Sequence, residues 1–422
     1  MTRAGIVPLI EGIRAAVLRR AGGCVVGDML GGVRVVTIEA VGVVPGATGL
    51  MRDMGAEVIK IEPPGGESGR ANWKRPTDTG DTFPGGGFFD MRNRGKQSVT
   101  LNIATPEGRE VLLRLLADAD VFCHNLRASA VEKYGLDYET IGAMYPKLVY
   151  CSFSGYGEHG LDRDKDGWGP VALWSRAGLG AHYGDFDSMP EPTRGAMDDT
   201  IATIGVLACI LGALVERASS GLGQKVSTSH YHLGAWINTP ISQALQGEDV
   251  PYRVGHWDSP TRAIYECADG RWLFVHAGRP AHWRGLWEAI GREEIIDDPR
   301  FATPAAREAH KDELLELIAG EIRKRPAAEW DRIITDRGGA GGMVYTVEDV
   351  VNDPQAEANG FWQHYDTPAG PRRLLAPPMQ YSRTPLTPRG PAPDAGEHTD
   401  RVLAAAGYSP AEIAELRASK IV

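Results

Sequence analysis

The sequence predicts an α/β protein of two lobes, in which the larger lobe is built on a parallel, doubly wound sheet. The chain has 422 residues, and at about 150 residues per domain this length corresponds to two or three lobes, with two as the default. Between residues 33 and 155, strand patterns alternate with single helix patterns, which is typical of βαβ units. After residue 237 the pattern changes to a hairpin followed by helices, which predicts a smaller α+β lobe.

The larger lobe begins with the run VRVVTIE at residues 33–39, whose apolar residues predict a buried strand. Pro45 opens a helix that ends near residue 55, and EVIKIE at residues 57–62 predicts the next strand. No GxGxxG motif follows the first strand, so a nicotinamide or flavin cofactor is not predicted. The alternation continues with strands at 98–102, 120–125 and 147–155 and with helices at 105–119 and 129–144.

The middle of the chain combines a long irregular segment with a long apolar run. Residues 157–198 are rich in Gly, Asp and Pro and lack a periodic pattern, which predicts a loop around a site or at an interface. The run at residues 201–218 follows Asp198 and Asp199, and it predicts a mostly buried helix. Glycines interrupt this run, and no window reaches the roughly 18 consecutive apolar residues of a membrane span.

The smaller lobe begins with RAIYECADGRWLFVHAG at residues 262–278. This segment predicts a hairpin whose two strands are joined by Asp269 and Gly270, and helices are expected at 280–291 and 313–325.

The last part of the chain gains proline and glycine from residue 346 onward. Residues 372–398 are too proline-rich to be a core element, so an extended segment along a surface is predicted. A final helix follows, opened by Ser409 with Glu412 three residues later as a capping box.

Composition excludes several classes of function. A net charge of −10 and a pI near 5.6 leave no basic footprint, so nucleic-acid binding is not predicted. The five cysteines are odd in number and form no CxxC pair, which predicts free thiols in a reducing compartment and neither disulfides nor a zinc site. We therefore expect a soluble, cytoplasmic protein that binds no membrane and no metal.

Asp199 is the residue whose position best fits a chemical role. A carboxylate at the start of a buried helix can act as a nucleophile, because the helix N-terminus favours its charged form. Aspartate is also a preferred helix cap, and from the pattern alone capping is the more common role. His230 and His232 alternate across a predicted strand end without an acidic partner at ligand spacing, so a histidine-based site is not predicted.

Basic residues near the ends of predicted strands point to an anionic ligand. In open α/β sheets, ligands bind at the edge formed by the carboxyl ends of the strands. Lys96, Arg127, Lys133 and Lys165 all lie at or near the ends of predicted strands, although any one of them alone is more often a solvated surface charge.

Several long sequence blocks then identify a family. They are GAEVIKIEPPGG, NRGKQSVTLNIATPEGREVLLRLLADADV, YGLDYETIGAMYPKLVYCSFSGYGEHG, ERASSGLGQKV and GEHTDRVLAAAGYSPAEI. In this order they resemble the class III CoA-transferases, also called the formyl-CoA transferase and carnitine CoA-transferase family, from about residue 30 to the C-terminus. NLRASAVEKYGLDYET and DKDGWGPVALWSRAGL look most similar to the branch that acts on aryl or branched organic acids, such as cinnamoyl-CoA:phenyllactate and benzylsuccinate CoA-transferases.

The resemblance implies an enzymatic role for Asp199. Counting back from Glu216 and Arg217 places the family's catalytic aspartate at Asp199, with Asp198 as the one-residue alternative. Its carboxylate would attack an acyl-CoA thioester to give a mixed anhydride, and the CoA thiolate would return to give an aspartyl-CoA thioester. Coenzyme A is then a substrate, and no permanently bound cofactor is expected. The implied CoA contacts are Gly42, Val43, Leu101, Asn102, Asn125, Leu126, Arg127, Lys133, Lys165, Asp166, Gly167 and Trp168.

The resemblance also implies an architecture. We expect a Rossmann-like large domain built from both chain ends, an inserted small α+β domain, and two subunits joined as an interlocked-ring homodimer. A heteromer with a related subunit is the alternative. The expected borders are an N-terminal extension at 1–28, the first part of the large domain at 29–230, a linker and small domain at 231–345, and a return segment at 346–422.

Two departures from the family pattern bear on function. Gly42 stands where some members have a glutamine, and Asp166-Gly167-Trp168-Gly169 replaces the more common Pro-Gly-aromatic-Asp. The α-methylacyl-CoA racemases share this fold and have a histidine at the position of Trp168. An indole cannot exchange a proton at an α-carbon, so racemisation by that pair of residues is not expected. A CoA-ester racemase and a non-catalytic CoA-binding subunit remain the alternative functions.

Overall fold

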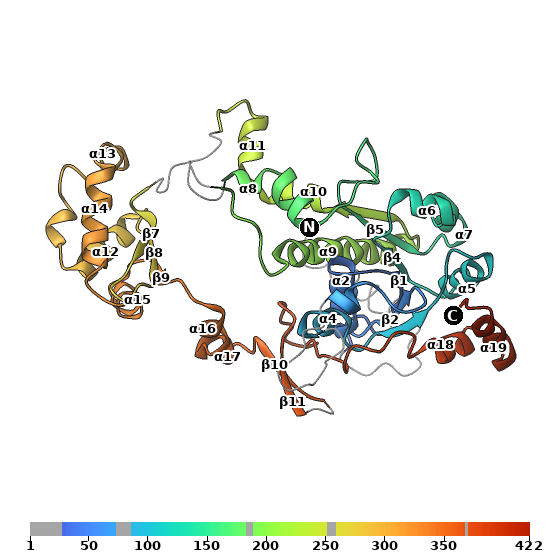
Figure 1. Ribbon diagram of the computed structural model, residues 1–422. Helices are drawn as coiled ribbons and strands as arrows, with labels where there is room; N and C mark the ends of the chain where they lie inside the picture. The colour runs from blue at the N-terminus through green and yellow to red at the C-terminus, as the bar shows by residue number, and fades with distance from the viewer. Residues whose placement is uncertain (1–27, 73–85, 183–188, 251–258, 368–369) are drawn as a thin grey trace, which may run out of the picture. The chain divides into compact units, whose positions relative to one another are not determined.

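The computed structural model describes residues 28–72, 86–182, 189–250, 259–367 and 370–422 (Figure 1). The predicted N-terminal extension lies outside the described residues, apart from Asp28. The described chain forms two compact units. The first comprises the residues up to Gly180, Pro192–Asp249 and Asn359–Val422, and the second comprises Ala181–Glu191 and Val250–Ala358. Both ends of the described chain therefore contribute to the first unit.

The first unit is built on a six-stranded sheet whose paired strands are all parallel, in the order β3-β2-β1-β4-β5-β6. The predicted doubly wound sheet is confirmed. The strand order reverses between β1 and β4, which is where ligands bind in folds of this kind. The strands are β1 Arg34–Ile38, β2 Glu57–Glu62, β3 Gln97–Thr100, β4 Val121–His124, β5 Val149–Ser154 and β6 Lys225–Ser229.

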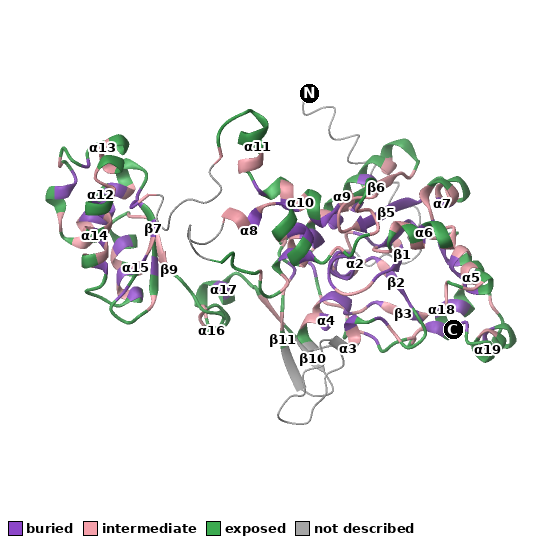
Figure 2. Cartoon of the chain, turned by 45° about the horizontal axis from the view of Figure 1, so that its top comes forward, coloured by how far each residue is buried: buried purple, intermediate pink, exposed green. Residues whose placement is uncertain are grey.

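Helices cover both faces of this sheet. Val35 and Val36 are neighbours on β1, both fully buried, and they belong to two different hydrophobic clusters because successive strand residues point to opposite faces. One cluster includes α2 Val43–Asp53 and α9 Met197–Ser220. The other includes α5 Pro106–Leu116, α7 Tyr138–Met144, α18 Thr399–Ala405 and α19 Pro410–Ala418. Figure 2 shows burial concentrated in the strands and on the inward sides of the helices.

The caps predicted at Thr105 and Ser409 are confirmed, whereas α9 begins at Met197 after Ala196, so Asp199 lies inside the first turn and does not cap the helix. The Thr105 hydroxyl accepts the backbone N–H of Gly108, and Ser409 forms the expected capping box with Glu412 at the start of α19. The prediction of a single helix over 129–144 is wrong. Gly135 adopts a left-handed φ of 60° and ends α6 Ala128–Tyr134 before α7 begins.

The helix α9 is less buried than its sequence predicts. Ala202, Val206 and Ile210 lie in the core, but Ile204 is 41% exposed and Val215 is 59% exposed. The helix covers the sheet with one face only, so only that face is buried. By length and composition α9 could also cross a membrane, a test that apolar core helices pass as well.

Two local predictions around α9 are also corrected. The segment predicted as loop over 157–198 contains the π-helix η1 Pro170–Arg176 and the short helix α8 Leu179–His182. The strand predicted to carry the two histidines ends at Ser229, whose hydroxyl accepts the backbone N–H of His232. The chain therefore turns into the helix α10 His230–Ile237 at this point, and α11 Pro240–Leu245 follows.

The second unit contains the predicted hairpin. The strands β7 Arg262–Glu266 and β8 Trp272–His276 pair in antiparallel fashion, and Gly270 has a φ of 72° in the turn. Trp283, Trp287 and Trp330 are buried in the core beneath this sheet. The other elements are α12 Pro280–Ile290, η2 Glu293–Ile295, α13 Pro304–Ala309, α14 Lys311–Ile322, α15 Ala327–Asp336, β9 Gly341–Met343, α16 Val347–Val351 and α17 Pro354–Ala358.

The C-terminal segment returns to the first unit through the hairpin of β10 Trp362–Thr367 and β11 Gly370–Leu375. The segment predicted as an extended surface stretch over 372–398 begins within β11, and its remainder has no helix or strand. The carbonyl of Pro391 accepts the N–H of Gly95 at 2.8 Å. Leu386 is nevertheless buried against the α2 and α9 cluster, so this stretch does contribute to the core. The helices α3 Gly69–Asn72 and α4 Gly86–Asn93 complete the unit.

Candidate active site

Asp199 lies in the first turn of α9, at the edge of the sheet formed by the carboxyl ends of the strands. The residue before the helix, Ala196, has a left-handed φ of 54°, which turns the chain into α9. The side chain of Asp199 is 17% exposed, whereas its neighbour Asp198 is buried. Of the two adjacent carboxylates, Asp199 is therefore the one that can reach a substrate.

Glycines make room for both carboxylates. Gly42 follows β1 and precedes α2, and a Cβ atom at this position would overlap Oδ2 of Asp199. A Cβ atom on Gly169 would likewise overlap Oδ2 of Asp198. In this conformation neither position 42 nor position 169 has space for a larger side chain, because the two α9 carboxylates occupy that space.

Among the described residues, the side chain of His230 makes the ion-pair contact with the Asp199 carboxylate. Its Nε2 lies 3.5 Å from Oδ1 of Asp199, and its ring packs edge to face on Phe153 with centroids 4.8 Å apart. Its Nδ1 is buried and has no hydrogen-bond partner in the described part of the chain. His230 has no acidic partner at ligand spacing in the sequence, but the fold brings it to Asp199, which comes from a different helix.

Arg92 on α4 approaches the same carboxylates from the protein interior. Its Nη1 donates to the carbonyl oxygen of Gly42 at 2.9 Å, and its Nη2 donates to Oγ1 of Thr200 at 3.2 Å. Burial lowers the pKa of Arg92 to about 10, against the opposing charges of Asp199 and Asp198. The guanidinium therefore stays charged at neutral pH.

The pKa of Asp198 is also shifted by burial and by a neighbouring charge. Burial raises the pKa of its carboxyl group above the usual value, and the nearby charge of Asp199 raises it further. We call Arg92, Asp198, Asp199 and His230 the reactive cluster.

A second group of buried charges, here called the paired cluster, consists of Glu39, Lys60, Glu62, Glu67, Arg70 and Lys96. Nζ of Lys96 donates to Glu39 at 2.6 Å, Lys60 pairs with Glu67, and Arg70 pairs with Glu62 at 2.6 Å. Burial lowers the pKa of Lys96 to about 8, with Glu39 opposing the shift. Lys96 is fully buried by this pairing, so its predicted role as a contact for an anionic ligand is wrong.

The paired cluster and Asn125 fix the loop between β1 and α2. Val41 has a positive φ of 68°, unusual for a branched residue, and its N–H donates to Oε2 of Glu67 at 2.7 Å. The side-chain amide of Asn125 bonds both backbone groups of Ala40, at 3.2 and 2.9 Å. The structure thus brings Gly42 and Asn125 together with Asp199. The side-chain amide of Asn125 already forms hydrogen bonds with the loop.

Predicted CoA contacts after β4 and β5 also come together. Arg127 forms an exposed ion pair with Asp166, and the N–H of Leu126 donates to Nδ1 of His124 at 3.3 Å. Gly167 packs so closely against the backbone of Gly155, at the end of β5, that neither position has space for a Cβ atom.

The remaining predicted contacts divide into two groups. The Lys133 ammonium lies 5.5 Å from the ring centroid of Tyr134, and Trp168 is 59% exposed, so both face solvent at this edge. Lys165 is likewise exposed and lies over the ring of Tyr156.

Leu101 and Asn102 follow β3, two strands away from β1. Leu101 is buried in the core, and the N–H of Asn102 donates to the C-terminal Ile421. Val43 is buried and offers the site only its backbone.

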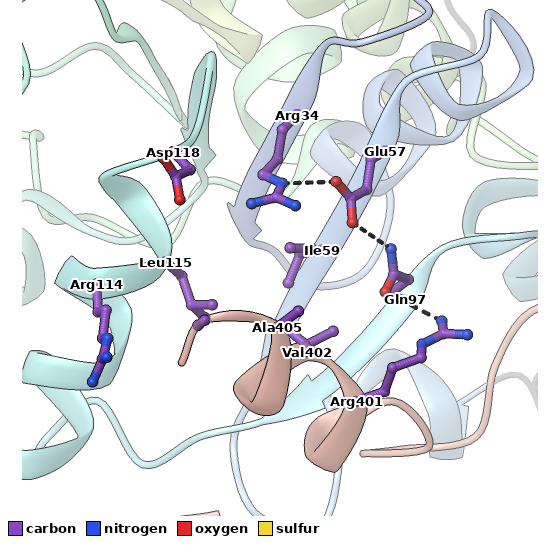
Figure 3. A pocket seen from close by; sticks show the side chains of 11 residues that line it. Arg34, Glu57, Ile59, Gln97, Arg114, Leu115, Asp118, Arg401, Val402 and Ala405 are labelled. Atoms are coloured by element: carbon purple, nitrogen blue, oxygen red, sulfur yellow. Dashed lines mark hydrogen bonds and ion pairs between the residues drawn. The ribbon is translucent and has the colours of Figure 1, made fainter. Parts of the chain in front are cut away.

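The opposite edge of the sheet holds a cavity of about 360 Å³ between α5 and α18 (Figure 3). Its polar side chains bond one another in a chain, with Arg34 on Glu57 at 2.7 Å and Gln97 on Glu57 at 2.9 Å. Arg401 continues this chain by donating to Gln97 at 3.2 Å. This cavity lies at the opposite edge of the sheet from Asp199, and the carboxylate of Glu57 within it is engaged by Arg34 and Gln97.

Sequence reasoning missed Arg92 and His230. Arg92 directly precedes the block NRGKQSV, but nothing local in the sequence places it beside α9. For His230 a signal was present, because Ser229 is a helix cap that ends the predicted strand one residue earlier.

Comparisons with known proteins show the family of this chain. The sequence model described as CoA-transferase family III matches residues 30–399. (R)-2-hydroxy-4-methylpentanoate CoA-transferase of Clostridioides difficile is 31% identical over 401 residues, covering 93% of this chain and 99% of that protein. Cinnamoyl-CoA:phenyllactate CoA-transferase of Clostridium sporogenes is 30% identical over 403 residues, covering 93% of this chain and 97% of that protein.

Solved structures share the fold. A CAIB/BAIF family protein from Brucella suis superposes with a TM-score of 0.77 at 29% identity, covering 90% of this chain and 100% of that one. Rv3272 from Mycobacterium tuberculosis gives a TM-score of 0.79 at 25% identity, covering 89% of this chain and 99% of that one.

Proposed function

Because the chain belongs to CoA-transferase family III, we propose that Asp199 is the nucleophile with which it moves coenzyme A from an acyl-CoA to an organic acid. The observation that carries this proposal is the position of the Asp199 carboxylate. It is partly exposed, it lies at the carboxyl edge of the sheet, and it sits between Gly42 and His230. The buried Asp198 lacks that access and is the less suitable nucleophile.

The proposed reaction proceeds through two covalent intermediates on Asp199. A carboxylate oxygen bonds to the thioester carbonyl carbon, and the C–S bond breaks, so that CoA leaves as a thiolate. The thiolate then attacks the Asp199 carbonyl carbon of the mixed anhydride and releases the donor acid as a carboxylate. The incoming acid repeats both steps in reverse order and leaves as its CoA thioester, which regenerates Asp199. No water takes part, and the thioester energy is retained throughout.

Backbone groups beside Asp199 are suited to stabilise the negative charge that forms on the carbonyl oxygens. At the start of α2 the N–H groups of Val43 and Val44 have no partner within the helix, and they lie next to Gly42. Pro45 has no N–H, and the N–H of Gly46 donates to the carbonyl of Gly42 at 3.0 Å. The donors of Val43 and Val44 cost no reorganisation during the reaction because the fold holds them in place.

We propose that the exposed side chains of Arg127, Lys133 and Lys165 attract the phosphates of CoA to this edge. For the acyl group we propose an aryl or branched organic acid, since the two relatives above are named for acids of this kind. We further propose an interlocked homodimer in the cytoplasm, with a heteromer as the alternative. Size measurement of the pure protein distinguishes a chain that assembles alone from one that needs a partner.

The direct test is a transfer assay that screens CoA donors and organic acids by mass spectrometry. We expect Asp199→Ala to lose transfer by at least about 10³-fold while CoA still binds, and Asp198→Asn to retain far more activity. Full transfer by Asp199→Ala would contradict the proposed nucleophile. Transfer that begins only when a related chain is added would instead favour the role of a CoA-binding subunit.

One observation favours a second candidate, a CoA-ester racemase. His230 contacts Asp199, and a histidine beside an aspartate can move protons at an α-carbon. Incubating a branched acyl-CoA in deuterium oxide tests this, because racemisation introduces deuterium at the α-position without any transfer of CoA.

A further inference from the structure

We propose that Arg92 is a positioning residue for CoA transfer, which joins the two backbone segments that enclose the Asp199 carboxylate and keeps a buried positive charge beside it. This inference rests on the proposed role of Asp199 as the nucleophile. Arg92 does not itself reach the reacting atoms, since it is only 2% exposed.

The hydrogen bonds of Arg92 define the bridge. Nη1 donates to the carbonyl of Gly42, which borders the Asp199 carboxylate, and Nη2 donates to the hydroxyl of Thr200, the residue after Asp199. The guanidinium is a rigid planar fork, so it can hold these two acceptors at a fixed separation. Lysine has a single terminal nitrogen on a flexible stem and cannot reproduce this geometry.

Two threonines extend the bridge into both helices. The Thr203 hydroxyl donates to the carbonyl of Val43 on α2 at 3.1 Å and accepts from Nη1 of Arg92 at 3.4 Å. The Thr200 hydroxyl donates to the carbonyl of Ala196 at 3.0 Å, in the turn that begins α9. Each hydroxyl thus donates to one backbone carbonyl while it accepts from Arg92. The network connects the start of α2 to the start of α9.

The charge of Arg92 requires a separate explanation. Burying a guanidinium is costly unless it is paired, and no carboxylate forms a direct ion pair with Arg92 among the described residues. Its Nε is buried and has no hydrogen-bond partner in the described part of the chain, and its guanidinium lies 3.9 Å from the ring centroid of Phe88. Neutral residues could link α2 to α9 at a lower cost. The retained charge therefore points to the two nearby carboxylates, whose charges oppose the loss of its proton.

The proposed reaction has a use for a fixed cation at this place. In every step one negative charge passes between Asp199, the CoA thiolate and a released carboxylate, and no proton neutralises it. A buried cation that stays in place lowers the energy of each of these anions without moving during the reaction.

Among the described residues, the charged or titratable groups that face Asp199 are Asp198 on its own helix, Arg92 on α4 and His230 on α10. Replacing Arg92 with methionine removes one charge from this set and keeps most of the side-chain volume. We expect Arg92→Met to lower kcat by about 10²-fold with little change in the KM for acyl-CoA. We also expect the acidic limb of the pH–rate profile to move up by about one pH unit, because the ionised carboxylate loses a cation.

Arg52→Met is the matched control. Arg52 also donates to two backbone carbonyls, those of Gly95 and Ala56, but at the other end of α2. This variant should leave the acidic limb where it is in the parent protein. A purely structural role for Arg92 would likewise leave the limb in place in Arg92→Met, so an unmoved limb with kcat within twofold of the parent overturns the proposal.

Arg92→Lys keeps the charge and tests the bridge if Arg92→Met fails to fold. We expect its acidic limb to stay in place while kcat falls by about tenfold, since lysine cannot hold Gly42 and Thr200 together. An unchanged kcat in Arg92→Lys would overturn the bridging role. These outcomes differ from failure of the proposed function, in which the parent protein transfers no CoA or Asp199→Ala remains fully active.

Discussion

Two groups of buried charged side chains contact the loop that follows β1. They differ in how many of their charged and polar atoms have a hydrogen-bond or ion-pair partner. In the paired cluster, oppositely charged side chains bond one another directly, as Lys96 does with Glu39 and Arg70 with Glu62. In the reactive cluster, His230 Nδ1 and Arg92 Nε are buried and have no hydrogen-bond partner among the residues that the structure describes, and the Asp199 carboxylate is partly exposed. A fully paired group stabilises a fold, whereas a partly paired group beside an accessible carboxylate is suited to bind and react.

The largest effect is expected from breaking the paired cluster at Lys96. Lys96→Met leaves the carboxylate of Glu39 buried beside one cation fewer, which should lower the free energy of unfolding by about 3–5 kcal/mol. Urea unfolding at pH 7 measures this loss. Arg34→Met is the control, because its ion pair with Glu57 is partly exposed and should be worth at most about 1 kcal/mol. Equal losses in the two variants would remove the distinction between a buried and an exposed pair.

The Glu62→Gln variant tests the paired cluster through the pH dependence of the free energy of unfolding. Burial acts to raise the pKa of Glu62, but its hydrogen bond to Arg70 and the charge of Lys60 outweigh burial and lower it to about 2. A carboxyl whose folded pKa is lowered stabilises the fold above its unfolded pKa, near 4.5, and loses this contribution as the pH falls toward 2. At pH 7 the variant should be less stable by about 3 kcal/mol.

The stability difference between parent and Glu62→Gln should shrink as the pH falls below 4.5. Urea titrations at pH 7, 4 and 3 follow this convergence. A difference that stays constant across these pH values would mean that the Glu62 charge does not act through its pairing.

In the reactive cluster, two glycines separate the roles of the adjacent aspartates. A methyl group on Gly42 would displace the Asp199 carboxylate, and one on Gly169 would displace that of Asp198. We expect Gly42→Ala to lower kcat by at least about 10²-fold, which corresponds to about 2.7 kcal/mol, and Gly169→Ala to lower it much less. Steady-state transfer assays decide between them, and a larger loss in Gly169→Ala would assign the reaction to Asp198.

The smallest effect is expected from His230→Phe. The aromatic ring can still pack on Phe153, but the contact between Nε2 and Asp199 is lost. Because His230 orients the carboxylate without forming a bond in the reaction, kcat should fall by about tenfold, or about 1.4 kcal/mol, with little change in melting temperature. A loss as large as that of Asp199→Ala would place His230 among the residues that react.

The sheet could be predicted from the sequence because its signals are local. Val35 and Val36 lie in an apolar run bounded by turns, and the alternation with helices continues through β5. The burial of α9 could not be predicted in the same way, since which face is covered depends on elements far away in the sequence. The break between α6 and α7 could have been predicted from the sequence, because Gly135 ends the first helix and Asp137 caps the second.

The candidate site was predictable only in part. Asp199 follows from its place at the head of a long helix and from the family motifs, and Gly42 follows from its position after the first strand. Arg92 and His230 meet Asp199 only when α4, α9 and α10 come together, so no spacing rule along the chain finds them. The ion-pair partners of Lys96 could not be predicted for the same reason, so Lys96 was wrongly predicted to contact an anionic ligand.

Trapping the covalent intermediate on Asp199 tests the central claim most directly. The protein is incubated with an acyl-CoA that supports transfer, treated with hydroxylamine, digested and analysed by mass spectrometry. We predict a hydroxamate on the peptide that contains Asp199, dependent on acyl-CoA and absent from Asp199→Asn. A hydroxamate on Asp198, or an unmodified peptide from protein that transfers CoA at the full rate, would contradict the account.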